Sequence, residues 1–267
     1  MSGTNSLLAG TALILYVAAF LQVRSQTTDV HSNNKTTILL SLLILLALLP
    51  HTAITLAKII STGGLDLSLL YASNYLAVIM TGLVLVCSLK LPVVSLNLLL
   101  LPICIINLLL LTSVDPGISN PIPLEPPQMA HIGLSLTAYA CLLTAALQSL
   151  LFTVQNTKLK QTKVNFYRVL PPLETMEKLM ISMILVGTAL LALSIISGLL
   201  FLENMFEQQL THHIILPSVA WLCYLGLLIG NSFYGWRGDT VVKLNLSAFS
   251  FLLLGYVGSK FVLEYLA

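Results

Sequence analysis

PPQMAHIGLSLTAYACLLTAALQSLLFTV, residues 126–154, is the stretch that decides the fold. It contains no charged side chain and is long enough to cross a ~30 Å hydrocarbon layer as one helix, because each residue rises about 1.5 Å. One ionisable residue, His131, lies near its start. An ionisable group inside a membrane is costly unless it is paired, hydrogen-bonded or bound to a ligand, so His131 is the first candidate for function. A helix cap or a contact with lipid headgroups would explain the same position.

The composition of the whole chain is that of a polytopic membrane protein. Its 267 residues are 57% hydrophobic and only 8% charged, with a mean hydropathy of +0.95, whereas soluble domains carry about 25% charged residues. The net charge is only +2 and the basic residues form no repeating face along any segment, which argues against a nucleic-acid partner. The cysteines stand singly within apolar runs and form no CxxC motif, so thiol–disulfide exchange and covalent haem attachment are not expected.

Apolar runs of spanning length predict an all-α fold, a bundle of eight transmembrane helices that makes residues 1–267 a single integral membrane domain. The runs cover residues 5–24, 37–60, 67–89, 92–112, 128–154, 179–202, 212–232 and 241–265. Only Lys90, Leu91 and Pro92 separate the third run from the fourth, which predicts a tight hairpin there.

The basic residues predict the orientation of the bundle, because Lys and Arg near helix ends stay on the cytoplasmic side. Ten of the twelve fall in loops on one side: Arg24, Lys35, Lys90, Lys158, Lys160, Lys163, Arg168, Lys178, Arg237 and Lys243. The exceptions are Lys58 and Lys260. Both termini are therefore predicted to face the periplasm or cell exterior.

Two loops differ in character under this topology. Residues 112–128 hold five prolines and no basic residue, which predicts an extended outer loop that leads to His131. Residues 155–178 are basic and contain the pair Pro171–Pro172, which predicts a cytoplasmic loop where any preceding helix has ended.

Four of the five histidines fall in the outer half of the membrane under this topology, whereas His31 falls in a cytoplasmic loop. His51 lies ~10–13 Å below the outer end of the second predicted helix, and His131 ~5–8 Å below that of the fifth. Imidazoles at such depths can face each other across a flat ligand. His212 and His213 stand at the mouth of the seventh predicted helix, where headgroup contact explains them adequately.

Two neutral imidazoles at similar depth suit an iron porphyrin, so we predict a non-covalent b-type haem with His131 and His51 as iron ligands. Zinc fits less well, because no carboxylate or thiolate lies at matching depth. Lys58, two turns further out on the face of His51, is a candidate partner for the propionates, although a snorkelling lysine explains it too. Tyr139 is a candidate floor of the pocket, and a tyrosine bonded to a neighbouring helix is the alternative.

Five ordered blocks in the second half of the chain carry a family resemblance. They are HIGLSLTAYACLL (131–143), LPPLETMEKLMISMILVGTALLALSIISGLLF (170–201), SVAWLCYL (218–225), GWRG (235–238) and LLLGYVGSKFVLE (252–264). Together they resemble the cytochrome c assembly family, and they look closest to its short HemX/YpjD-like branch. The first half resembles this branch through LLPHTAITL (48–56).

The resemblance implies an eight-helix, non-enzymatic haem-handling protein of the bacterial inner membrane. It is related to the CcsA, CcmC and CcmF proteins, which hold haem at the outer membrane surface for delivery to apocytochrome c. His131 occupies the position of the external histidine that those proteins use as a haem ligand. The implied partners are the lipid bilayer, haem, and another membrane protein or an apocytochrome.

The chain also departs from the family pattern. The tryptophan-rich WWD segment is replaced by LENMFEQQLTHH (202–213), and neither the segment KFVLEYLA (260–267) nor the region of Gly230 and Asn231 carries the histidine found there in CcsA proteins. The second iron ligand is then expected to be His51, with His212 or His213 behind it.

These departures keep a second hypothesis open. A scaffold or regulatory membrane subunit could retain the fold without haem transfer and act through contacts with a partner membrane protein. A transporter fits less well, because only histidines bring ionisable groups near helix centres and no pair of matched broken helices is present.

Overall fold

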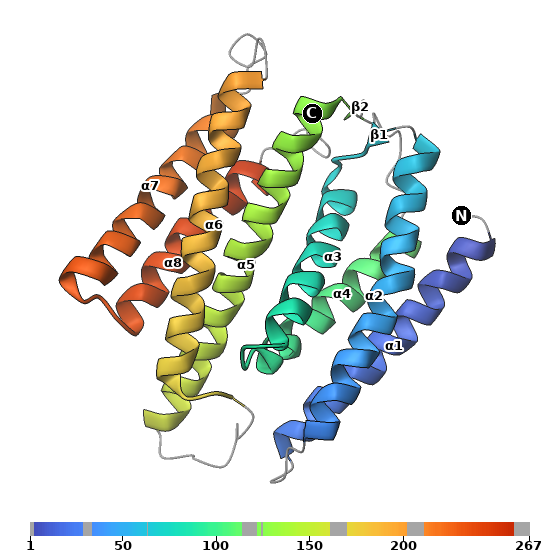
Figure 1. Cartoon of the computed structure of the whole chain (residues 1–267), viewed down its shortest axis with the longest axis horizontal. Coiled ribbons are helices and arrows are strands. Elements are labelled where there is room, and N and C mark those ends of the chain that lie inside the picture. The colour runs from blue at the N-terminus through green and yellow to red at the C-terminus, as the bar shows by residue number, and fades with distance from the viewer. Residues whose placement is uncertain are drawn as a thin grey trace. The chain divides into compact units, whose positions relative to one another are not determined.

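The computed structural model describes residues 3–28, 34–62, 64–113, 122–123, 125–160, 170–201 and 211–258. These residues form eight α-helices, which confirms the predicted all-α fold (Figure 1). The helices are α1 (Gly3–Thr28), α2 (Asn34–Thr62), α3 (Leu69–Ser88), α4 (Asn97–Ser113), α5 (Pro126–Lys160), α6 (Leu173–Phe201), α7 (Thr211–Tyr234) and α8 (Asp239–Leu253). The shorter elements are the 3-10 turn η1 (Val94–Leu96), the π-helical turn η2 (Leu254–Gly258) and the strands β1 (Gly64–Leu65) and β2 (Ile122–Pro123).

Within the described part of the chain, seven of these helices are long and apolar enough to cross a membrane. The eighth, α8, has 15 residues and continues directly into η2. Many large apolar side chains are exposed, for example Leu7 and Ile14 on α1, at 72% and 71%. A helix surface of this kind is suited to hydrocarbon rather than water, so the chain is a multi-pass membrane protein.

The predicted cytoplasmic loop over residues 155–178 is helical at both of its ends, which corrects its bounds, and residues 161–169 lie outside the described residues. Helix α5 continues to Lys160, and α6 begins at Leu173, immediately after Pro171 and Pro172. Gln, Lys and Leu are good helix formers, so α5 does not end where its apolar run ends. The proline pair is compatible with the start of α6, because the first turn of a helix leaves its backbone N–H groups without intrahelical partners.

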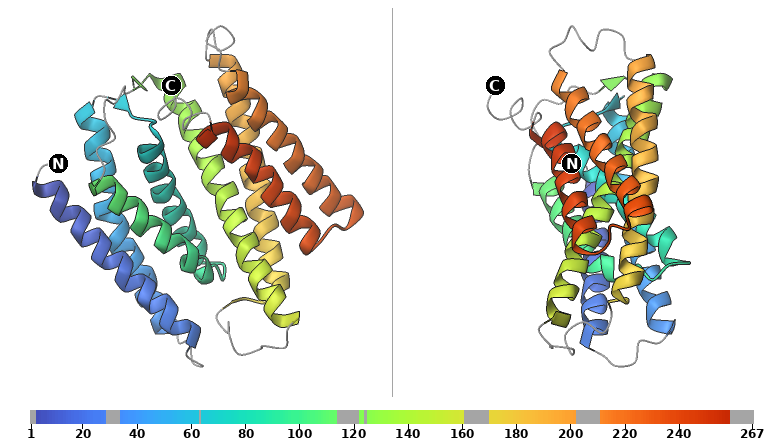
Figure 2. Two further views of the ribbon diagram at one scale, coloured as in Figure 1. Left: turned by 180° about the vertical axis from the view of Figure 1, so that it is seen from behind. Right: turned by 90° about the vertical axis from the view of Figure 1, so that its left-hand side faces the viewer.

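The chain divides into two compact units, and each is described by itself. Unit 1 comprises residues 1–123 and 155–172 and contains α1–α4. In it, α1 and α3 each contact both α2 and α4, which closes a ring of four helices (Figure 2). The buried face of α1 repeats every three or four residues and is rich in small side chains, which let helices approach closely in a membrane. Its members are Ala9, Ala12, Tyr16, Ala19 and Val23.

Unit 2 comprises residues 124–154 and 173–267, and contains most of α5 together with α6, α7 and α8. Helix α7 contacts α6 and α8. Hydrogen bonds attach α5 to both α6 and α8; in one, Asn245 Nδ2 donates to Ser149 Oγ at 2.7 Å. The prediction of one domain over residues 1–267 concerns the two units together and stays a prediction.

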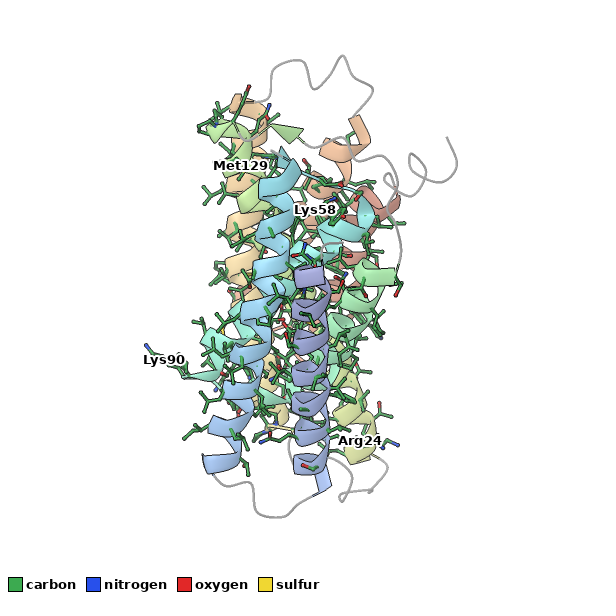
Figure 3. The ribbon with its side chains drawn as sticks, turned by 90° about the vertical axis from the view of Figure 1, so that its right-hand side faces the viewer. Arg24, Lys58, Lys90 and Met129 are labelled. Atoms are coloured by element: carbon green, nitrogen blue, oxygen red, sulfur yellow. The ribbon has the colours of Figure 1, made fainter. Side chains whose placement is uncertain are left out.

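Basic residues within unit 1 separate along the helix axes. Arg24 at the end of α1 and Lys90 after α3 lie toward one end of this unit, and Lys58 near the end of α2 lies toward the other (Figure 3). This arrangement is the one expected from the basic loops and the exceptional Lys58. The direction in which the termini face stays a prediction.

Candidate functional site

His131 lies in the second turn of α5, two residues after Met129, which Figure 3 labels, and its ring packs against α6. The half-buried imidazole places Nδ1 3.0 Å from the carbonyl oxygen of Ser194 and 3.1 Å from Ser197 Oγ. A carbonyl oxygen only accepts hydrogen bonds, so Nδ1 carries the proton of the neutral ring. The lone pair of His131 therefore lies on Nε2.

Gly198 leaves the space that the His131 ring fills. An ideal Cβ at this glycine would stand 2.9 Å from Cε1 and 3.3 Å from Nδ1 of the ring. These separations are shorter than van der Waals contact, so only glycine lets the ring take this position on α6. The absence of a side chain at Gly198 thus sets where the imidazole lies.

Serine hydroxyls complete the contacts around His131. Ser135 Oγ donates to the His131 carbonyl oxygen at 2.8 Å and lies 2.6 Å from Ser194 Oγ. Ser197 Oγ donates to the Ser194 carbonyl oxygen at 2.8 Å. Within the described residues, no hydrogen bond reaches Nε2 of His131. This nitrogen is the one available to a ligand.

His51 occupies a different environment, inside unit 1. It is fully buried; its Nδ1 lies 3.1 Å from the Tyr16 hydroxyl and its Nε2 lies 2.8 Å from Asn74 Oδ1. Thr55 Oγ1 donates to the His51 carbonyl oxygen and so must accept from Asn74 Nδ2, at 2.9 Å. That fixes the Asn74 amide with its oxygen toward His51. The proton of His51 therefore lies on Nε2, and Tyr16 donates to Nδ1.

Both nitrogens of His51 are thus used by side chains from α1 and α3. The Tyr16 ring also meets the imidazole edge to face, with centroids 5.7 Å apart and planes at 84°. To bind iron, His51 would have to give up either Tyr16 or Asn74. The role of His51 as an iron ligand stays a prediction, and it would require the loss of one of these two hydrogen bonds. Sequence reasoning did not find Tyr16 or Asn74, whose only signal was a polar group inside an apolar run.

Lys58 and Tyr139 have partners of their own. Lys58 Nζ lies 5.0 Å from the centroid of the Tyr71 ring, a cation–π contact between α2 and α3. The Tyr139 hydroxyl donates to the carbonyl oxygen of Leu252 at 3.5 Å, and its ring meets Tyr256 edge-on at 6.2 Å. Tyr139 therefore joins α5 to the junction between α8 and η2. The predicted roles at a haem pocket stay predictions for both residues.

His212 and His213 begin α7, and their side chains lie outside the described residues. Helix α6 ends at Phe201, α7 begins at Thr211, and the two helices pack together. The first turn of α7 is therefore at the end of unit 2 where α6 carries Ser197 and Gly198. These histidines and His131 share one end of one unit.

Comparisons with known proteins agree with this architecture. A family model described as "Cytochrome C assembly protein" matches residues 4–267. The chain belongs to the cytochrome c assembly protein family. Among the relatives of this family member are the "Inner membrane protein YpjD" of Escherichia coli strain K12, 38% identical over 137 residues, and an "Uncharacterized 28.8 kDa protein in nifR3-like 5'region" of Azospirillum brasilense, 30% identical over 139 residues.

Each of these matches covers 51% of the chain, and 52% of the first relative and 51% of the second. The chain thus spans about half the length of the curated relatives it matches. No solved structure matches the chain. With its apolar helices and a relative named as an inner membrane protein, this cytochrome c assembly protein is a multi-pass inner-membrane protein.

The residues around His131 fit the haem that the resemblance implies. Metal-binding histidines generally donate their second ring N–H to a carbonyl or carboxylate, which fixes the tautomer, and His131 makes this contact with Ser194. Within the described ranges, no cluster of three or more His, Cys, Asp or Glu residues could hold a free metal ion. A porphyrin already supplies four nitrogens, so it needs only one or two ligands from the protein.

Proposed function

We propose that this cytochrome c assembly protein is a non-enzymatic haem-binding protein, which holds a b-type haem without a covalent bond for cytochrome c biogenesis or related haem handling. The observation that carries the proposal is the state of His131: a half-buried imidazole with Nδ1–H on a carbonyl and an unbonded lone pair on Nε2 within the described residues. The membership of the chain in this family and the position of His131 near the start of an apolar helix support the same function.

In this proposal, His131 Nε2 is the first iron ligand. Bound haem would supply an iron centre, which His131 and a second nitrogen ligand of the protein would hold. His212 or His213 is now favoured for that second position over His51, because the first turn of α7 belongs to the unit and the end that hold His131. His51 would have to lose a buried hydrogen bond to serve.

A second candidate function is a scaffold or regulatory membrane subunit that keeps the fold without haem transfer. Two observations favour it: the engaged state of His51, and the sequence LENMFEQQLTHH (202–213), which lacks the tryptophans of the family pattern. Such a subunit would act through contacts with a partner membrane protein. A stoichiometric partner that co-purifies from haem-depleted cells would support this candidate.

The proposed function is tested by adding haem to the detergent-solubilised protein and recording absorption spectra before and after reduction. We expect a Soret band that saturates at one haem per chain and is lost in His131→Ala. The matched control is His31→Ala, which removes a histidine outside the predicted membrane half that holds the others. Equal Soret bands in the wild type and His131→Ala would refute haem binding by His131.

A further inference from the structure

Three groups on one face of α6 hold the His131 ring: the Ser194 carbonyl, the Ser197 hydroxyl and the bare Cα of Gly198. We propose that these residues, called the His131 seat below, are positioning residues that fix the tautomer and direction of the imidazole so that Nε2 is presented to a ligand. The inference rests on the proposed function and extends it to residues that sequence reasoning did not single out. Their spacing of three and four residues places all three on the same helix face.

The proton arrangement makes the seat selective for one tautomer. Ser197 uses its own hydroxyl proton on the Ser194 carbonyl, at 2.8 Å, so its oxygen can only accept from His131. Both atoms near Nδ1 are therefore acceptors, at 3.0 and 3.1 Å. A lone pair on Nδ1 would face two acceptors, which is repulsive. The seat thus requires a proton on Nδ1 and leaves the lone pair on Nε2.

Gly198 sets the direction of the ring. A methyl group at this position would come within 2.9 Å of Cε1, the atom between the two nitrogens, so the whole imidazole would have to move away from α6. That movement would lengthen the contacts to Ser194 and Ser197 and would redirect Nε2. Gly198 therefore lets the ring lie where Nδ1–H reaches both acceptors, and this position in turn fixes the tautomer.

A purely structural role explains this arrangement less well. Helices α5 and α6 do not need His131 to pack closely, because they already do so elsewhere: a Cβ on Gly187 would lie 2.7 Å from Leu142 Cγ. The buried His51 shows how a structural histidine is satisfied, with both nitrogens bonded. His131 instead is bonded through one nitrogen within the described residues, and the seat uses only that one.

The test is made on the full chain in detergent, with two readouts. The first is the 15N NMR spectrum of histidine side chains in the haem-free protein, in which His131 is assigned from the His131→Asn variant. The second is the haem affinity from Soret titration. The variants are Gly198→Ala and Ser197→Ala, and Ser197→Thr keeps the hydroxyl. The controls are Gly133→Ala, where a Cβ meets nothing within 4 Å, and Ser250→Ala, which removes an exposed hydroxyl.

We expect His131 to be an Nδ1–H tautomer in the wild type, in Ser197→Thr and in both controls. Gly198→Ala should mix the tautomers, whereas Ser197→Ala should shift them less, because the Ser194 carbonyl still accepts from Nδ1. Both variants should weaken haem binding about 10–100-fold, the usual effect of losing a contact that orients a ligand. An Nε2–H tautomer in the wild type, or wild-type tautomer and affinity in both seat variants, would overturn the seat. A wild-type protein with the Nδ1–H tautomer that takes up no haem would overturn the proposed function but not the seat.

Discussion

His51 and His131 carry their single protons on opposite ring nitrogens. In His51 the Asn74 amide oxygen receives the proton of Nε2, and in His131 the Ser194 carbonyl receives the proton of Nδ1. The first ring is saturated by Tyr16 and Asn74, and the second keeps Nε2 without a hydrogen bond among the described residues. This difference separates a histidine that holds helices together from one that is able to bind a ligand.

The saturated histidine predicts a stability effect in unit 1. Tyr16→Phe removes the donor to His51 Nδ1 and keeps the edge-to-face ring contact. We expect the free energy of unfolding to fall by about 1 kcal/mol, since interhelical hydrogen bonds in membranes are worth roughly 0.6–1.7 kcal/mol. The measurement is denaturant unfolding in detergent. Tyr234→Phe is the matched control, because Tyr234 is 75% exposed. Equal losses in the two variants would argue against the His51 network.

The identity of the second iron ligand can be tested by comparing variants of His51 with variants of His212 and His213. We expect His51→Ala to lower stability but retain the Soret band, because its ring holds α1, α2 and α3 together. We expect the double variant His212→Ala/His213→Ala to change the Soret band while unfolding like the wild type. Absorption spectra and thermal unfolding of the haem-loaded variants provide the check. A Soret band that depends on His51, with no dependence on His212 or His213, would return the second ligand to His51.

Close packing between α5 and α6 predicts a cost for Gly187→Ala. A Cβ at this position would lie 2.7 Å from two atoms of Leu142, which is itself fully buried. Overpacking of this kind costs about 1–3 kcal/mol. Gly226→Ala is the control, since a Cβ there meets nothing within 4 Å. The midpoint temperature of thermal unfolding of Gly187→Ala should be well below that of Gly226→Ala. The reverse order would contradict this packing.

The turn between α7 and α8 depends on a left-handed glycine. Gly238 has a φ of 57° and donates its backbone N–H to Glu177 Oε1 at 3.1 Å. With its ψ of −125°, this backbone conformation costs a residue with a side chain about 1–3 kcal/mol, so Gly238→Ala should unfold more easily than Gly82→Ala, where space is open. Urea titration in detergent measures the difference. Equal midpoints would mean that the turn adopts another conformation.

The sequence predicted where the helices lie along the chain better than which side of each helix packs against its neighbours. Apolar runs located the eight helices because the membrane requires such runs, and His131 was recognised because it interrupts one of them. The helices are apolar toward both lipid and core, as Ile14 and Ala12 of α1 illustrate, so periodicity did not show which side chains meet. The partners Tyr16, Asn74, Ser194 and Gly198 depend on helix order and rotation, which only the structure provides.

The continuation of α5 to Lys160 was missed for a related reason. Its last residues are mostly charged or polar, so an apolar run does not include them, yet Gln155, Lys158 and Lys160 favour helix about as strongly as the preceding leucines. Hydropathy locates the part of a helix that the membrane holds, and intrinsic propensity decides where the helix ends. The two signals diverge at Gln155, where the apolar run stops.

The measurement that tests the central claim most directly is rescue of His131→Gly by free imidazole. This variant leaves the space of the ring open next to Ser194, Ser197 and Gly198. If His131 Nε2 binds the iron, His131→Gly should show no wild-type Soret band after haem addition, and imidazole in solution should restore that band. A wild-type band in His131→Gly without imidazole would contradict the claim that this histidine holds haem.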